Sequence, residues 1–258
     1  ENAYKKGAYR YCMVFSGRGP SKKRVEFLSG VIKRIKRNFP IEVCLSPGLI
    51  SAEDAKHLAE AGLDRYNHNL NTSESHYEKI CTTHTFKDRL DTLSNVNANN
   101  IDICSGMIVG MGESDEDIVD VALKLREVNV KSIPINFYLH MEGNKLGKLP
   151  KVSPEKCCKI VSMFRCVHPQ AEIRLAAGRE YYLGELQSMA LMAANSLFMN
   201  GYLNIKGSDI HETISMIETA GFSVDADVDL KKLKASAKTM NALTQFNTSQ
   251  LELKSKEE

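Results

Sequence analysis

The 258-residue chain has no tryptophan and no long apolar run. Its one extended uncharged stretch, residues 186–205, contains several Asn, Ser and Gln residues, so it is too polar to span a membrane. We expect a buried helix followed by a strand there. The net charge of +2 is too small to favour nucleic acid or an anionic membrane surface as a partner.

The number and spacing of the cysteines also exclude a class of structure. There are seven, an odd number without regular spacing, and nothing in the sequence resembles a secretory signal. A disulfide framework is therefore not expected, and a reducing cytoplasm is the expected compartment. The seven histidines show no metal-ligand spacing either. Hydrophobic residues make up 43% of the chain, which is enough for a sizeable core.

Strand and helix patterns alternate regularly along the chain. Strands are expected at 9–15, 41–46, 64–69, 102–108, 132–137, 172–176 and, more weakly, 195–199. Helices are expected at 21–37, 51–61, 85–97, 114–128, 153–167, 183–193 and 210–220. Ser51, Ser114 and Ser153 provide N-cap signals for three of these helices. Such alternation predicts parallel strands joined by crossover helices.

This count gives seven βα units, whereas a closed parallel barrel has eight. The sequence therefore predicts an α/β fold, a TIM-type (βα)8 barrel that lacks its first βα unit. The chain begins at Glu1 rather than Met, and a fragment that starts inside the second unit would explain both observations. A doubly wound open sheet is the alternative. We expect residues 1–224 to form the partial barrel and 225–258 to be a charged tail, either disordered or a frayed helix.

Four side chains stand out by their position in the expected strands. Cys12, Cys44, Cys104 and Arg174 share a strand face with polar residues, opposite the apolar face. The apolar face should pack against the helices, so these four should face the barrel lumen. Burying such groups without partners is costly, which favours a ligand there. The alternatives are that each cysteine is a small core residue and that Arg174 forms a structural ion pair with Glu42 or Asp102.

Residues 66–73 read YNHNLNTS, which resembles the YNHNL(D/N)TS motif of the biotin synthase family within the radical S-adenosylmethionine superfamily. Matching segments lie at 10–14, 16–21, 82–84, 88–92, 104–106, 110–113, 132–136, 173–180 and 194–196. Together they extend the resemblance over residues 9–222. The resemblance implies an enzyme that inserts sulfur into dethiobiotin to make biotin. Its implied cofactors are a 4Fe–4S cluster, S-adenosylmethionine and an auxiliary 2Fe–2S cluster that donates the sulfur.

The resemblance also assigns roles to lumen residues. Cys12, Cys44, Cys104 and Arg174 match the ligands of the 2Fe–2S cluster, and thiolates are the expected iron ligands. The substrate contacts are implied to be amides: Asn67, Asn69 and Asn136 match positions that hydrogen-bond the ureido ring of dethiobiotin. An amide suits a neutral cyclic urea because it can both donate and accept.

For S-adenosylmethionine, the resemblance implies contacts from Asn69, Asn71 and Arg89, with Ile108 packed on the adenine. A lone arginine such as Arg89 is otherwise an ordinary exposed cation. The implied partners are an electron donor such as flavodoxin or ferredoxin and a second copy of the chain in a homodimer. No nucleic-acid or membrane partner is expected.

The sequence departs from the family in one important respect. The CxxxCxxC motif that binds the 4Fe–4S cluster is absent, so the chain by itself is expected to be unable to generate the radical. Two other functions stay open: a different radical enzyme of the hydrogenase-maturase-like group, and a non-catalytic barrel that binds a cluster or a small ligand. A CxxxCxxC encoded upstream of Glu1 would exclude the non-catalytic barrel.

Overall fold

The computed structural model describes residues 1–5, 8–198 and 207–224. The chain divides into two compact units, Glu1–Phe198 and Met199–Glu258. In the second unit the described part contains helix α10 (Ile210–Thr219), which the sequence predicted at 210–220. The predicted charged tail at 225–258 lies outside the described residues.

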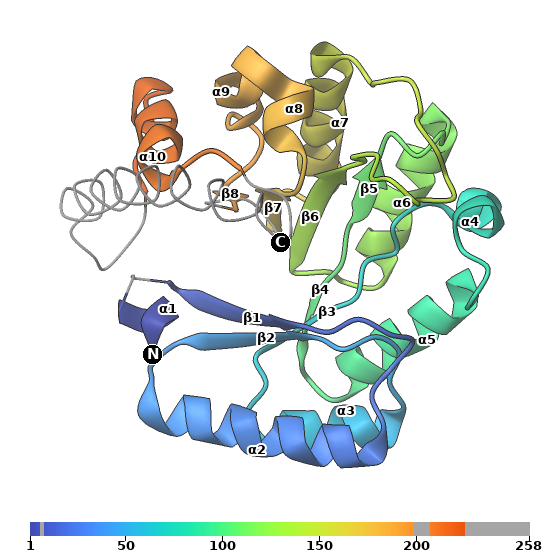
Figure 1. Cartoon of the computed structure of the whole chain (residues 1–258), viewed down its shortest axis with the longest axis vertical. Coiled ribbons are helices and arrows are strands. Elements are labelled where there is room, and N and C mark those ends of the chain that lie inside the picture. Colours follow the sequence, from blue (N-terminus) through green and yellow to red (C-terminus); the bar gives the residue numbers. More distant parts are fainter. Residues whose placement is uncertain (6–7, 199–206, 225–258) are drawn as a thin grey trace, which may run out of the picture. The chain divides into compact units, whose positions relative to one another are not determined.

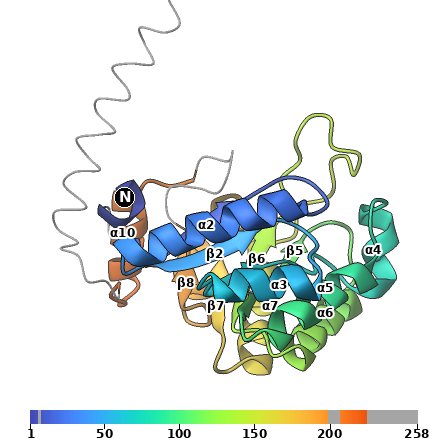
Figure 2. The same ribbon diagram turned by 90° about the horizontal axis from the view of Figure 1, so that it is seen from below.

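The first unit is a curled parallel sheet with helices on its outer face (Figures 1 and 2). The strands are β1 (Arg10–Val14), β2 (Glu42–Ser46), β3 (Arg65–Asn67), β4 (Asp102–Cys104), β5 (Met107–Val109), β6 (Ser132–Phe137), β7 (Glu172–Leu175) and β8 (Ser196–Leu197). Their order is β1-β2-β3-β4-β6-β7-β8, and β5 also pairs with β6. β4 and β5 are consecutive segments that share one strand position, so the eight strands occupy seven positions. The seven predicted strands are therefore confirmed. The curled sheet is the partial TIM-type barrel rather than a doubly wound sheet.

Helix α1 (Asn2–Lys5) precedes β1, and further helices connect the strands. They are α2 (Lys22–Asn38), α3 (Ala52–Glu60), α4 (Glu74–Ile80), α5 (Phe86–Ala98), α6 (Asp115–Glu127), α7 (Pro154–Val167), α8 (Arg179–Leu183) and α9 (Gln187–Ala190), with a 3₁₀ turn at Gly184–Leu186. The side chains of Ser51, Ser114 and Ser153 accept hydrogen bonds from backbone N–H groups three residues later, as their N-cap positions predicted. Among the described residues, no helix is long and apolar enough to cross a membrane.

The hydrophobic core lies between the sheet and its outer helices. Helix α2 buries Val25, Leu28 and Ile32, which share one helix face, and β2 buries Val43 and Leu45 on its outward face. Side chains of the opposite parity on each strand therefore face the lumen. This confirms the assignment of faces on which the candidate site depends.

One predicted strand, 102–108, is interrupted between β4 and β5. A Cβ atom at Gly106 would lie 1.9 Å from the carbonyl oxygen of Pro134, so only glycine fits this close approach. The backbone N–H of Ser105 still donates to the carbonyl of Ser132 at 3.0 Å. The sheet therefore stays continuous while the strand shifts its pairing toward β6.

Three helical segments differ from the prediction, of which the short helix α1 was not expected at all. The single helix expected at 183–193 is broken into shorter pieces, because Gly184 has a φ of +51° between α8 and the 3₁₀ turn. Helix α4 was not predicted, although Ser73 caps it in the usual way, with its hydroxyl accepting from the His76 N–H at 3.1 Å. The polar residues that precede α4 belong to the YNHNLNTS segment, which obscured the start of the helix.

Candidate metal centre and substrate site

The layer of the lumen at the N-terminal ends of the strands is charged. Arg10, Glu42, Arg65, Asp102 and Glu172 are the first residues of β1, β2, β3, β4 and β7, and we call these five residues the ionic floor. Because they start parallel strands, they lie at the same edge of the sheet. Four of the side chains are 10–25% exposed, whereas that of Asp102 is 47% exposed.

Ion pairs connect the members of the ionic floor. Arg10 donates from Nε to Glu42 Oε2 at 2.8 Å and from Nη2 to Glu172 Oε2 at 3.2 Å, which joins β1 to β7. Arg65 donates from Nε to Glu42 Oε2 at 3.2 Å, and its Nη2 lies 3.7 Å from Asp102 Oδ2. Each buried charge thus has a partner of opposite sign, as burial requires.

Three cysteines form the next layer of the lumen. Cys12, Cys44 and Cys104 each lie two residues beyond a member of the ionic floor on the same strand, and therefore on the same face. Cys12 and Cys44 are register partners on neighbouring strands. Cys44 and Cys104 are each only 1% exposed. All three are free thiols, and the Cys12–Cys44 hydrogen bond, with the charge of Arg174 acting on Cys12 and Cys104, shows that they lie on one face together with Arg174.

The electrostatic environment distinguishes the three thiols. A hydrogen bond from Cys44 lowers the pKa of Cys12 to about 7, against the opposing effect of burial and with help from Arg174 and Arg10. The same pairing, together with burial, raises the pKa of Cys44 well above its ordinary value. Burial also raises the pKa of Cys104, and the charge of Arg174 opposes this shift. Cys12 is therefore the thiol most readily ionised.

Arg174 shares this layer, two residues beyond Glu172 on β7. Its Nε donates to Ser196 Oγ at 3.0 Å, and its Nη2 donates to a carboxylate oxygen of Glu172. Its guanidinium carbon lies 5.1 Å from the centre of the Phe198 ring. Its ionic partner is thus Glu172 of its own strand, rather than Glu42 or Asp102.

Three of the four side chains in this layer are thiols, which are the usual ligands of iron–sulfur clusters. Within the described residues, no three His, Cys, Asp or Glu side chains converge closely enough to hold one ion. A 2Fe–2S cluster instead distributes four protein ligands over two irons. Ser132, on the strand beside Cys104, is buried, and its side-chain hydrogen bond with Cys104 acts to lower the pKa of that thiol.

The three predicted substrate amides lie at and above the thiol layer. Asn67 Nδ2 lies within hydrogen-bond distance of Cys104 Sγ, and Asn69 Oδ1 accepts from the Gly106 N–H at 3.1 Å. Asn136, 8% exposed, donates from Nδ2 to the Met107 carbonyl at 3.3 Å. The amides therefore come from both sides of the interrupted strand.

The predicted cofactor residues gather near the carboxyl ends of the same strands. Arg89 donates from Nη1 to the Asn69 carbonyl and from Nε to the hydroxyl of Tyr77. The Ile108 N–H donates to the Asn71 carbonyl at 2.8 Å. The structure thus brings Asn69, Asn71, Arg89 and Ile108 together. Tyr77, which orients Arg89, was missed because it lies on the unpredicted helix α4.

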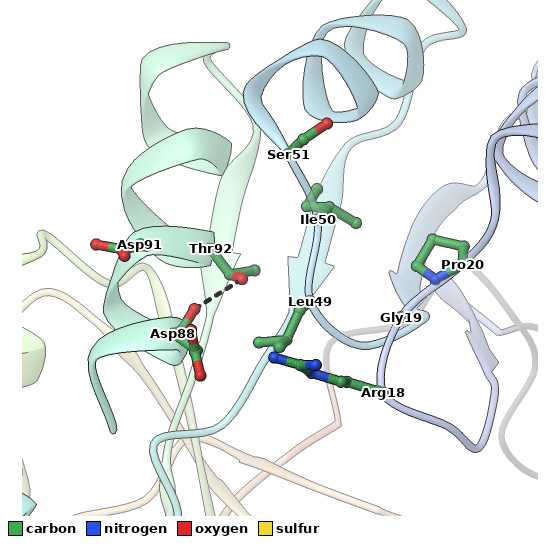
Figure 3. Close-up of a pocket in the computed structure, with 9 residues that line it drawn as sticks. All are labelled: Arg18, Gly19, Pro20, Leu49, Ile50, Ser51, Asp88, Asp91 and Thr92. Atoms are coloured by element: carbon green, nitrogen blue, oxygen red, sulfur yellow. Dashed lines mark hydrogen bonds between the residues drawn. The ribbon is translucent and has the colours of Figure 1, made fainter. Parts of the chain in front are cut away.

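A surface pocket of about 450 Å³ lies outside the lumen, between the loops after β1 and β2 and helix α5 (Figure 3). It is lined by Arg18, Gly19, Pro20, Leu49, Ile50, Ser51, Asp88, Asp91 and Thr92. The two loops are joined by the Leu49 N–H, which donates to the Arg18 carbonyl at 2.7 Å. None of the predicted site residues lines this pocket, so it is separate from the candidate centre.

Two family models match most of the chain. The model described as Radical SAM superfamily matches residues 1–125, and the Biotin and Thiamin Synthesis associated domain matches residues 134–223. Solved structures share the fold. Methylornithine synthase has a TM-score of 0.72 at 16% identity over 91% of this chain and 74% of its own. The FeFe-hydrogenase maturase HydG from Carboxydothermus hydrogenoformans has a TM-score of 0.71 at 16% identity over 85% and 56%.

Curated biotin synthases are much closer in sequence. The Magnetococcus marinus enzyme is 50% identical over 86% of this chain and 70% of its own length. Those of Leptospira interrogans and Acaryochloris marina are 54% and 52% identical, over 85% and 87% of this chain. The chain spans 63% and 65% of the lengths of these two relatives. At this identity and coverage, the chain belongs to the biotin synthase family.

Proposed function

We propose that the chain forms the cluster- and substrate-binding part of a biotin synthase, which inserts sulfur into dethiobiotin to give biotin. One observation carries this proposal: a single layer of the lumen contains Cys12, Cys44, Cys104 and Arg174, in a chain about half identical to curated biotin synthases. Three soft thiol donors and one guanidinium have no role in the packing of an ordinary barrel, whose lumen is apolar.

The residues divide into three groups by the partner that each would hold. Cys12, Cys44, Cys104 and Arg174 would hold the 2Fe–2S cluster, and Asn69, Asn71, Arg89 and Ile108 would hold S-adenosylmethionine. Asn67, Asn69 and Asn136 would hold the ureido ring of dethiobiotin. When bound, the cofactors would supply the chemistry: hydrogen abstraction from the substrate and the sulfur atom that replaces the hydrogen.

The chain itself would contribute placement. The ionic floor would provide paired charges at one end of the lumen, next to the thiols. The amides above the thiols would fix the substrate within reach of the sulfur layer, which lowers the entropic cost of the reaction.

The 258 residues contain no CxxxCxxC motif, so we propose that this chain alone does not cleave S-adenosylmethionine. The reaction also needs an external electron, for which we propose a carrier such as flavodoxin or ferredoxin. A homodimer in a reducing cytoplasm is the proposed setting. The absent motif also favours a second candidate, a barrel that binds the cluster and ligand without radical chemistry.

Binding of dethiobiotin to the anaerobically reconstituted protein tests the proposal. The matched control ligand is a linear carboxylic acid of similar length without the ureido ring. We expect dethiobiotin to bind and the linear acid not to bind, because the amides recognise the cyclic urea. Equal binding of both ligands, or binding of neither, would contradict the assignment.

A further inference from the structure

The guanidinium of Arg174 is held at two of its three nitrogens. Ser196 Oγ accepts from Nε at 3.0 Å, and Glu172 accepts from Nη2. Within the described residues, Nη1 makes no hydrogen bond. Because a guanidinium is planar and rigid, two fixed nitrogens fix the direction of the third. Arg174 lies in the thiol layer, so its remaining nitrogen is the one available to a group bound there.

Glu172 is itself held from its other side. Arg10 reaches it from β1 with Nη1 at 3.4 Å and Nη2 at 3.2 Å, and Arg65 Nη1 lies 3.8 Å away. Three arginines from three strands thus converge on one carboxylate. The ionic floor and Arg174 together contain three arginines and three acidic residues, so the charges balance. Glu172 is therefore a fixed anchor rather than a mobile counterion.

We propose that Glu172 is the positioning residue of Arg174: it orients the guanidinium so that Nη1 can serve as the fourth protein ligand of the cluster. This inference rests on the proposed function and deepens it by naming the residue that prepares the unusual ligand. Residues that hydrogen-bond a metal ligand on its side away from the metal commonly contribute on the order of 10- to 100-fold to metal affinity. The ionic floor would then act on the cluster through a single carboxylate.

Iron retention provides the test. The protein is reconstituted anaerobically with iron and sulfide, and the release of iron to a chelator is followed together with the charge-transfer absorption. We expect Glu172→Gln to release iron about tenfold faster and to alter the absorption band, because a neutral amide holds the guanidinium of Arg174 more weakly than a carboxylate does. Arg174→Met should also release iron faster. Adding Glu172→Gln to Arg174→Met should produce no further loss, because Glu172 acts through Arg174.

Two further variants separate positioning from stability. Asp102→Asn removes a carboxylate of the ionic floor that contacts Arg65 and not Arg174, and it should retain iron like the unchanged protein. Glu172→Asp keeps the charge for Arg10 but shortens the reach to Arg174, so it should fold and still lose iron faster. Unchanged iron release in both Glu172 variants, equal loss in Asp102→Asn, or an additive double variant would overturn the inference. If the unchanged protein takes up no iron at all, the proposed function itself fails.

Discussion

The side-chain amide nitrogen of Asn67 lies 3.5 Å from the sulfur of Cys104. The two residues are register partners on β3 and β4, so the sheet itself fixes this contact. Asn67 is a predicted contact of dethiobiotin, and Cys104 is a predicted ligand of the cluster that would donate sulfur. The relationship places the proposed substrate next to the proposed sulfur source without any loop movement.

Replacing the most buried of the three amides should weaken substrate binding. We expect Asn136→Ala to bind dethiobiotin about tenfold more weakly, because each lost hydrogen bond to a buried polar ligand costs about 1–1.5 kcal/mol. Isothermal titration of the reconstituted protein measures this change. The control is Asn38→Ala, since Asn38 lies at the end of α2, exposed and outside the lumen. Equal affinity in Asn136→Ala and Asn38→Ala would remove the pocket assignment.

The Cys12–Cys44 pair should control thiol reactivity in the cluster-free protein. Because the Cys44 hydrogen bond lowers the pKa of Cys12 to about 7, we expect alkylation of Cys12 to reach half its maximal rate near that pH. In Cys44→Ala the midpoint should move to higher pH. Mass spectrometry of alkylated peptides measures both profiles, and Cys157, whose pKa burial raises to about 12, provides an unreactive reference. An unchanged Cys12 midpoint in Cys44→Ala would contradict the pairing.

Acid should destabilise the fold through His68. Burial, with Arg89 and His84, lowers the pKa of this imidazole from 6.5 to about 3. Between these two pH values the unfolded chain binds a proton that the folded chain does not. Stability should therefore fall on acidification below pH 6.5, by at most about 1.4 kcal/mol per pH unit from this one group.

The variant His68→Leu should lose that part of the pH dependence. It should keep near-normal stability at neutral pH, because Nε2 of His68 is buried without a hydrogen-bond partner. Urea unfolding at pH 7 and pH 5 measures the difference. If the two proteins lose stability equally on acidification, the buried neutral imidazole is not responsible.

Two glycine substitutions should have opposite effects on stability. Gly106→Ala should cost about 1–3 kcal/mol or more, because its Cβ would lie 1.9 Å from the Pro134 carbonyl oxygen. Gly30→Ala, in the exposed interior of α2, should stabilise by about 0.5–1 kcal/mol, because its Cβ would meet nothing within 4 Å. Thermal unfolding of both variants tests the account of the strand break. A tolerated Gly106→Ala would show that the segment between β4 and β5 can move away from β6.

Strand parity was sufficient to predict the thiol layer. Side chains alternate between the two faces of a strand, so Cys44 and Cys104 lie on the face opposite to that of their buried apolar neighbours. Parallel pairing then brings the strands together. Asn67 and Asn69 lie in and just beyond β3, where the sequence predicted a strand. The roles of these residues toward a cluster, a cofactor or a substrate stay predictions.

The hydrogen-bond partners of Arg174 could not be predicted from strand parity. Parity shows that Glu42, Asp102 and Glu172 all face the lumen, but the choice among them depends on side-chain reach and on the competing arginines of neighbouring strands. Tertiary contacts also determined the break at Gly106 and the orientation of Arg89 by Tyr77. Local propensity carries no information on such contacts between distant segments.

The iron and acid-labile sulfide content of the anaerobically reconstituted protein tests the central claim most directly. The comparison is between Cys104→Ala, which removes a thiol from the lumen, and Cys166→Ala, which removes an exposed thiol from α7. We expect iron, sulfide and the charge-transfer absorption to fall sharply in Cys104→Ala and to stay unchanged in Cys166→Ala. Equal iron and sulfide in both variants would contradict the cluster site.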